Sequence, residues 1–223
     1  MEAGVSNSES FIEEVTEEVR RDRLFATFRK YGWIAILLVF GIVGGAAYTE
    51  WQKATDATEA KAFGDSILTA LDADSSEARR TALEGAAAAA DGNSDRLAIQ
   101  KLLLASDPAA DKMGTLKALD AVAADASVPQ IYRDLAALRR VIVAGPDMDI
   151  SARRAALDPL AIPGRAFRTL ALEQMAFLSV EAGDTAAAIT QLRALSTDQE
   201  APAGLRQRAT QMIEALGGET EKG

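Results

Sequence analysis

The residues of this chain that can do chemistry are carboxylates, arginines, lysines, tyrosines and serines, because its 223 residues include no histidine and no cysteine. Thiolate nucleophiles, disulfides, zinc sites built from these residues and Ser-His-Asp triads are therefore excluded. We interpret Asp72 and Asp74 as exposed loop acids. Asp147-Met148-Asp149 lacks the further ligands and the glycine of a calcium loop, which favours a helix-capping turn.

Motifs for nucleotide or ester chemistry are also missing from the sequence, including G-x-x-x-x-G-K-[ST] and G-x-S-x-G. The pairs Arg139-Arg140 and Arg153-Arg154 are typical of solvated faces, and the net charge of -9 argues against a nucleic-acid partner. We predict a protein that is not an enzyme, with no catalytic, cofactor-binding or metal-binding residues. The alternative is a membrane-anchored hydrolase, which requires two carboxylates to converge with one pKa raised.

The composition predicts an all-α fold, because 46 residues are alanine and no alternating strand pattern occurs. The expected helices are residues 50–72, 76–90, 95–106, 112–125, 128–144, 150–160, 164–182, 185–196 and 202–216. The first of these is expected to continue from the apolar segment before it.

Residues 31–49 are 19 consecutive uncharged residues, enough for a helix of about 28 Å that crosses one hydrocarbon core. Tyr31 and Trp33 stand at one end, and Tyr48 and Trp51 at the other, as aromatic belts do at the two interfaces. A buried core helix and a cleaved signal peptide are the alternatives. Seven carboxylates in the 30 preceding residues argue against a signal peptide.

The charges beside this span predict its orientation. Residues 20–30 carry five basic side chains and one acid, whereas the flank after Thr49 is mixed. Because basic residues stay on the cytoplasmic side, residues 1–30 are expected in the cytoplasm, residues 31–49 in the bacterial inner membrane and residues 50–223 in the periplasm.

Two shorter patterns lie in and before the span. Gly41 and Gly45 form a G-x-x-x-G pattern that lets helices approach closely, in a homodimer or against another membrane protein. In the tail, residues 1–10 are small and polar and lack periodicity, which predicts disorder. Ser10 and Glu13 then form a capping box that opens a short amphipathic helix. That helix either lies on the membrane surface or contacts a cytoplasmic partner.

The outer segment contains signs of a repeat of about 34 residues. Pro129, Pro163 and Pro202 are each expected to open a helix. Residues 172–202 follow a tetratricopeptide pattern, with Ala176 and Ala188 at its small positions and Gly183-Asp184 as its turn. At an offset of 73 residues, matching positions pair as Asp111 with Asp184, Leu119 with Leu192, Val122 with Leu195, and Pro129 with Pro202. A plain helical bundle is the alternative.

Stacked helical hairpins leave a concave surface that binds peptides or helices. The register places Tyr132, Arg139, Glu173 and Phe177 in this candidate groove. For Tyr132 and Phe177 the alternative is a position in the core.

Three consecutive segments form a recognisable pattern: F-I-E-E-V-T-E-E-V-R-R-D-R-L-F-A-T-F-R-K-Y-G-W, the glycine-rich span, and Y-T-E-W-Q-K-A after it. In these segments the chain resembles the bacterial ancillary Sec-translocon subunits of Gram-negative envelopes, in their alphaproteobacterial form. The resemblance extends over nearly the whole chain and is strongest in residues 10–65. Ser179 departs from the tetratricopeptide pattern, at a position that is usually aromatic.

The resemblance implies a single transmembrane helix followed by a tetratricopeptide-like helical-repeat domain. It further implies an adaptor beside the SecYEG translocon, working with a periplasmic chaperone on exported polypeptides, with the lipid bilayer as its other partner. It supplies no catalytic residue and no cofactor. An envelope scaffold that coordinates cell division or wall synthesis is the alternative function.

Overall fold

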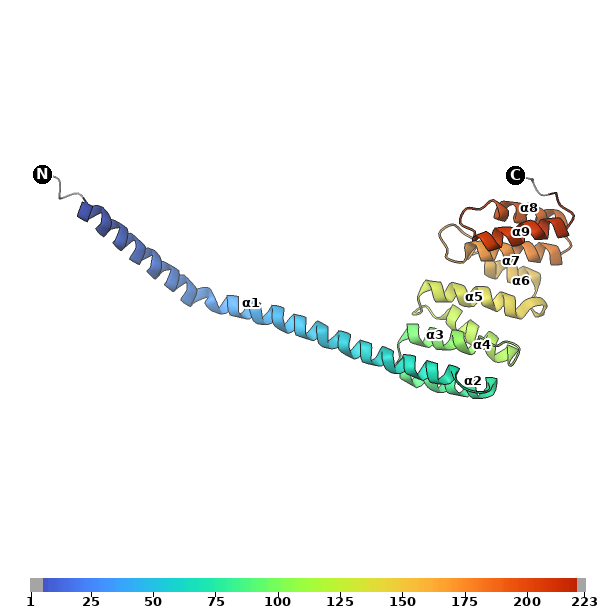
Figure 1. Cartoon of the computed structure of the whole chain (residues 1–223), viewed down its shortest axis with the longest axis horizontal. Helices are drawn as coiled ribbons and strands as arrows, with labels where there is room; N and C mark the ends of the chain where they lie inside the picture. Colours follow the sequence, from blue (N-terminus) through green and yellow to red (C-terminus); the bar gives the residue numbers. More distant parts are fainter. Residues whose placement is uncertain (1–5, 220–223) are drawn as a thin grey trace. The chain divides into compact units, whose positions relative to one another are not determined.

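The computed structural model describes residues 6–219, with the side chains of residues 29–34 and 36–219. Every regular element in this range is helical, so the predicted all-α class is confirmed there (Figure 1). The elements are α1 (Ser6–Leu71), α2 (Ser76–Gly85), the 3-10 helix η1 (Ala86–Ala90), α3 (Ser94–Leu104), α4 (Lys112–Ala124), α5 (Gln130–Ala144), the 3-10 helix η2 (Gly145–Asp147), α6 (Ile150–Leu157), α7 (Arg168–Glu181), α8 (Thr185–Ser196) and α9 (Ala203–Ala215). The chain divides into an N-terminal unit that ends at Thr58 and a C-terminal unit that begins at Glu59.

Helix α1 is unbroken from Ser6 to Leu71, so the expected continuity between the apolar segment and residues 50–71 is confirmed. The expectation that residues 6–10 lack regular structure is wrong, because the helix already includes them. Residues 6–10 contain no proline or glycine, the two residue types that most disfavour a helix, so the helix of the following residues extends through them. Residues 1–5 and the side chains of the capping box and amphipathic tail lie outside the described part of the chain.

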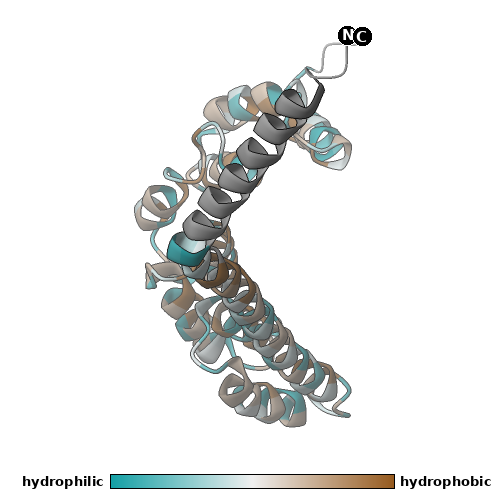
Figure 2. Cartoon of the chain, turned by 90° about the vertical axis from the view of Figure 1, so that its left-hand side faces the viewer, coloured by the Kyte–Doolittle hydropathy of each residue, from teal (hydrophilic) through white to brown (hydrophobic). Residues whose placement is uncertain are grey.

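The apolar part of α1 has no partner within its own unit. The segment Arg29–Leu71 is long and apolar enough to cross a membrane, and none of its most apolar window is buried. Figure 2 colours this apolar stretch brown. Phe40 and Ile42, for example, are 70% and 64% exposed. Exposure of such a continuous apolar surface to water is unfavourable, whereas the hydrocarbon core of a bilayer accommodates it. The exposed apolar segment is therefore compatible with a membrane anchor.

The helices of the C-terminal unit begin where short polar side chains replace missing backbone partners. The carboxylate of Asp111 accepts a hydrogen bond from the Gly114 amide at 2.8 Å, and that of Asp184 accepts one from the Ala187 amide at 2.9 Å. Asp149 caps α6 in the same way by accepting from Ser151, which confirms the capping turn expected there. These caps satisfy amide donors that the first turn of a helix leaves free.

The turn before α8 requires glycine. Gly183 has a φ of 79°, and the amide of Asp184 donates to the Ser179 carbonyl at 2.9 Å. This is a Schellman ending of α7, in which a residue without Cβ adopts the left-handed conformation at no steric cost. The expected Gly183-Asp184 turn is confirmed.

Proline has two different roles in this unit. Pro129 and Pro202 stand at the N-caps of α5 and α9, as expected. The expectation for Pro163 is wrong, because α7 begins only at Arg168. Gly164, with a φ of 84°, follows Pro163, and the Arg165 amide donates to the Ile162 carbonyl. A Pro-Gly pair favours this type of turn over helix initiation.

The core of the C-terminal unit is divided into four apolar clusters in series. Phe63, Leu83 and neighbouring alanines join the end of α1 to α2 and η1. The next cluster joins α3, α4 and α5, a third joins α5, α6 and α7, and the last joins α7, α8 and α9. Adjacent clusters along the chain therefore share or border the same helices, and each part of the unit is stabilised chiefly by its sequence neighbours.

The helices recur at a nearly constant interval. Helices α3, α5, α7 and α9 begin 36, 38 and 35 residues apart, and α4, α6 and α8 begin 38 and 35 residues apart. The offset of 73 residues also matches positions of equal structural role. Leu119 and Leu192 are 0% and 1% exposed, and Val122 and Leu195 are 0% and 2% exposed.

Several polar side chains are buried between these helices. The interpretation of Arg153 as part of a solvated face is wrong: its residue is 5% exposed and its guanidinium pairs with Glu181. Ser179, 2% exposed, lies within 3.2 Å of Gln191 Oε1 and accepts from Arg154. The hydroxyl of Ser179 therefore connects α6, α7 and α8 at a position where the tetratricopeptide pattern usually has an aromatic side chain.

The serial core predicts a local response to a cavity. Leu192→Ala removes a side chain that is 1% exposed in the α7–α9 cluster, and we expect it to cost about 2–5 kcal/mol of unfolding free energy. Hydrogen exchange should rise more in α7–α9 than in α3–α5. Met113→Ala, at a residue 83% exposed, is the control and should change stability by less than about 0.5 kcal/mol. Equal loss of protection in all helices contradicts this expectation.

Candidate functional site

A cavity of about 330 Å³ lies at the C-terminal end of the unit, where α7, α8 and α9 pack together. Figure 1 shows these three helices stacked beside one another. Five of the eight lining residues are apolar. The lining residues are Glu173, Phe177, Leu192, Arg208, Ala209, Gln211, Met212 and Ala215.

Helical spacing explains how the sequence builds the two long walls. Glu173 and Phe177 are four residues apart on α7 and so lie on the same face of that helix. On α9, Arg208, Met212 and Ala215 follow at intervals of four and three residues. Each wall therefore carries one charged side chain and, about one turn further along, a large apolar one.

The charges of the two walls neutralise each other. Arg208 donates to both carboxylate oxygens of Glu173, from Nε at 3.0 Å and from the terminal nitrogen at 3.1 Å. The side chain of Glu173 is 7% exposed, whereas that of Arg208 is 56% exposed. The hydrogen bond to Glu173 raises the pKa of Arg208. A bidentate pair of this kind fixes the separation of α7 and α9.

A second ion-pair cluster links α7 to the loop before α9. Arg168, the first residue of α7, pairs with Asp198 and donates to Glu200 at 2.8 Å. The Glu200 amide, and then the Arg168 guanidinium, hold the pKa of the Asp198 carboxyl below its ordinary value. The loop that leads into the α9 wall is thus attached to the start of the α7 wall.

Two of the four residues expected in a groove line this cavity, and two do not. Glu173 and Phe177 lie together in its α7 wall. Tyr132 packs half-buried against the α3–α5 cluster. The Arg139 guanidinium donates to the Leu102 carbonyl at 3.1 Å and also bonds the Ala105 carbonyl, so it closes the C-terminal end of α3.

The α9 wall was missed by reasoning from the sequence. Arg208 and Met212 stand 35 residues after Glu173 and Phe177. The same interval separates the starts of α7 and α9, so extending the repeat by one helix identifies both residues.

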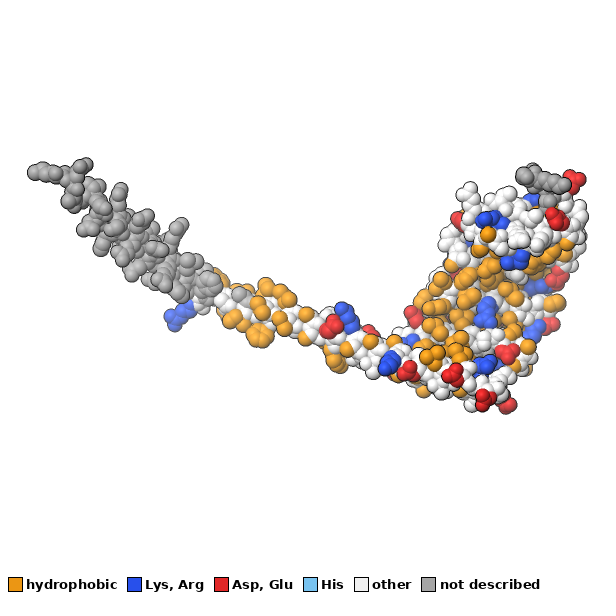
Figure 3. Space-filling view, viewed as in Figure 1, with side chains coloured by type: hydrophobic (Ala, Val, Ile, Leu, Met, Phe, Trp, Pro, Cys, Tyr) orange, Lys and Arg blue, Asp and Glu red, His pale blue; other side chains and the backbone are white. Residues whose placement is uncertain are grey.

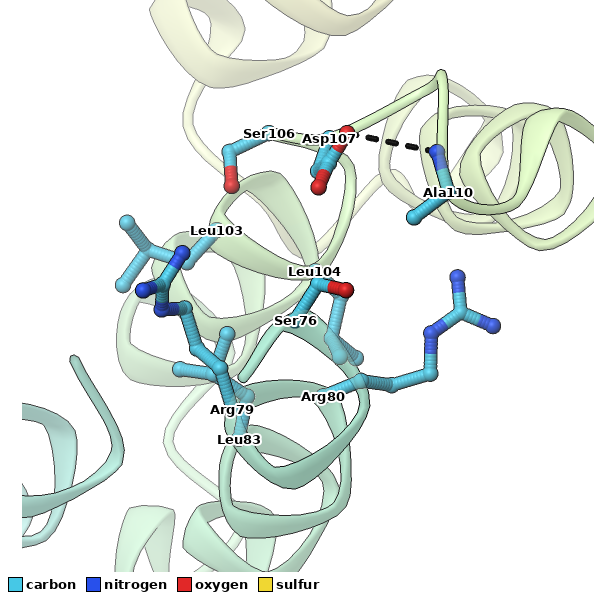
Figure 4. A pocket seen from close by; sticks show the side chains of 9 residues that line it. All are labelled: Ser76, Arg79, Arg80, Leu83, Leu103, Leu104, Ser106, Asp107 and Ala110. Atoms are coloured by element: carbon cyan, nitrogen blue, oxygen red, sulfur yellow. Dashed lines mark hydrogen bonds between the residues drawn. The ribbon is translucent and has the colours of Figure 1, made fainter. Parts of the chain in front are cut away.

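A second, smaller cavity of about 20 Å³ lies between α2 and the end of α3. Figure 4 shows that its two arginines, Arg79 and Arg80, extend in different directions, while the Ala110 amide donates to Asp107. Arg80 is paired with Asp111. A volume of this size holds about one water molecule, so the cavity is too small for an organic ligand.

The acidic residues considered for chemistry lie apart from both cavity walls. Asp147 pairs with Lys112 at 2.6 Å, and Asp72 and Asp74 are exposed. Among the residues that the structure describes, no group of three potential ligand side chains is placed to hold a metal ion.

Gly41 and Gly45 stand on the exposed apolar part of α1. Apart from the adjacent backbone of the helix itself, a Cβ atom at either position meets no atom of the described residues within 4 Å. Tyr48 and Trp51 stack at 6.1 Å beyond the glycines, and the Lys30 ammonium lies 5.6 Å from the Tyr31 ring before them. The glycine surface is therefore available to another helix.

The lowered pKa of Asp198 predicts an acid-sensitive attachment of the α9 wall. A carboxyl whose folded-state pKa is depressed adds stability above its unfolded-state pKa, and that stability is lost as pH falls through the folded value. We expect the unfolding free energy to drop between about pH 5 and pH 3, and Asp198→Asn to reduce that drop. Denaturant titrations at several pH values measure it. Asp72→Asn, at an exposed residue outside this ion-pair cluster, is the control for the loss of one carboxylate.

The free glycine surface predicts that association through α1 depends on small residues. The double variant Gly41→Ile and Gly45→Ile clashes with nothing in its own chain, so we expect helicity to persist while self-association in detergent is lost. Light scattering with circular dichroism tests this. Val43→Ile, about 200° around the helix from Gly41, is the control. Undiminished self-association of the double variant excludes the glycines as its contact.

Comparison of this chain with protein-family models, with curated proteins and with solved structures finds no match. The functional conclusion therefore depends on the chain's own residues. These provide an apolar helix with an exposed surface and a neutral, mostly apolar cavity whose single carboxylate is already paired.

Proposed function

We propose that this chain is a membrane-anchored adaptor, in which α1 holds the C-terminal unit at a bilayer and the α7–α9 cavity binds a polypeptide partner. The observation that carries the proposal is the cavity lining: apolar side chains surround one carboxylate, and that carboxylate is paired with Arg208. Binding of an apolar partner requires no more than this lining, because the burial of apolar surface supplies the favourable free energy.

The anchor is assigned to residues 31–49, with the N-terminus in the cytoplasm and residues 50–223 in the periplasm. Five basic residues before the apolar segment, against mixed charges after it, support this orientation. The exposure of the apolar part of α1 supports a lipid environment for it. A bacterial inner-membrane protein with one span follows from these assignments.

The C-terminal unit is assigned to the tetratricopeptide-like class. The intervals of 35 to 38 residues between equivalent helix starts support this class, as does the equal burial of residues 73 positions apart. In such arrays each hairpin stacks on the next and one face remains for ligands. The cavity between α7 and α9, two first helices of successive units, fits that face.

The partners are assigned from the sequence pattern of residues 10–65, which resembles the ancillary Sec-translocon subunits. We propose that the span docks on SecYEG while the periplasmic unit holds a chaperone or an exported polypeptide. The mechanism is proximity, since anchoring raises the local concentration of the bound partner where chains emerge. An envelope scaffold for division or wall synthesis has the same architecture with other partners.

A pull-down from membranes tests this assignment. The tagged chain, with and without residues 50–223, is captured from membranes solubilised in mild detergent, and its partners are identified by mass spectrometry. We expect translocon subunits with both forms, and chaperones only with the whole chain, because the cavity lies in the removed unit. Recovery of division or wall-synthesis proteins without translocon subunits overturns the translocon assignment.

A further inference from the structure

The occupant of the α7–α9 cavity is constrained first by the lack of free charge in its lining. Glu173 and Arg208 are its two charged residues, and they are bonded to each other at 3.0 and 3.1 Å. The carboxylate is almost fully covered, since its side chain is 7% exposed. The pair as a whole carries no net charge, so attraction of an ionic ligand to one member is opposed by repulsion from the other.

The size of the cavity is the second constraint. A cavity of about 150 Å³ lined by apolar residues binds a benzene molecule. The volume of about 330 Å³ between α7 and α9 therefore holds about two large apolar side chains. The ring of Phe177 provides a flat surface in the lining. Met212 provides a flexible one, because a methionine side chain adapts to differently shaped partners.

The third constraint is a polar side chain of the lining that can form hydrogen bonds with the main chain of a bound peptide. The Gln211 amide lies in the lining, is exposed, and has no hydrogen-bond partner among the described residues. An amide side chain both donates and accepts, as a peptide unit does. The cavity thus offers contacts for apolar side chains and for a backbone, and its lining has no net charge.

We infer that the α7–α9 cavity binds an uncharged, apolar peptide segment. The inference rests on the proposed adaptor function and names the ligand class: of the proposed partners, an exported polypeptide before folding presents such segments. An unfolded chain exposes the apolar side chains that folding later buries. Figure 3 shows that apolar side chains also gather over the visible face of the C-terminal unit, with acidic side chains mainly toward its margins.

Fluorescence anisotropy with the full chain in lipid nanodiscs tests the inference. The probes are three labelled peptides with blocked ends: one with two leucines and a phenylalanine among serines and glycines, one with those three residues replaced by serine, and one acidic. We expect the apolar peptide to bind about tenfold or more tightly than the others. Its affinity should change less than about twofold between roughly 50 and 500 mM salt, because no ion pair forms.

Two variants locate the binding. Ala215→Phe fills the cavity from an exposed position on α9, and Met212→Glu replaces an apolar side chain of the lining with a carboxylate. Each should weaken apolar-peptide binding about tenfold, since the first removes volume and the second requires a charge to be desolvated. Met113→Glu, the same substitution at a residue that is 83% exposed on α4, is the matched control and should bind as the unchanged protein does. Circular dichroism confirms that each variant folds.

Tighter binding of the acidic peptide, with an affinity that falls as salt rises, overturns the inference in favour of a charged ligand. Undiminished binding by both folded cavity variants overturns it by placing the peptide elsewhere. Neither result depends on capture of translocon subunits, so a failure here is distinguishable from a failure of the proposed adaptor function.

Discussion

The C-terminal unit depends on one packing constraint: its helices bury their apolar faces chiefly against helices that are near in sequence. Helix α4 packs on α5, α7 on α8, and α8 on α9, and the apolar residues form four clusters rather than one core. A stack of this kind extends by adding pairs of helices, each of which contacts chiefly its neighbours.

Ion pairs between residues 28 and 35 positions apart in the sequence accompany this stack. Arg153 joins α6 to Glu181 of α7, and Arg208 joins α9 to Glu173 of α7. Both pairs include a side chain that is nearly buried, so each carries a desolvation cost that its hydrogen bonds offset. The main effect of these pairs is to fix the distance between helices, and their net contribution to stability is small. In the α7–α9 cavity the pair also joins the two charged residues of the lining to each other.

The two units contribute different physical properties to the proposed adaptor. Helix α1 exposes a long apolar surface, which lipid accommodates and water does not. The C-terminal unit carries the charged surface and the cavity. A bound segment needs only moderate affinity when its acceptor is held near the site where it emerges. The paired carboxylate of Glu173 fits this role, since it shapes a wall and both of its oxygens accept hydrogen bonds from Arg208.

Local features were predictable from the sequence because they depend on a few neighbouring residues. The apolar segment follows from 19 uncharged residues, and the ends of helices follow from Asp111, Asp184 and Gly183 acting on adjacent amides. The offset of 73 residues even placed equivalent buried leucines, since the repeat period is itself a sequence property.

The positions of long polar side chains were decided by the tertiary structure. The sequence predicts Arg153 as a surface residue, but its side chain is buried. The sequence does not indicate this, because its partner Glu181 is 28 residues away and only packing brings the two together. Glu173 and Phe177 were predicted in a groove, yet the opposite wall of Arg208 and Met212 appears only when α9 is stacked on α7 and α8. A cavity is a space between elements, so its shape and its charge balance exist only after those elements have packed.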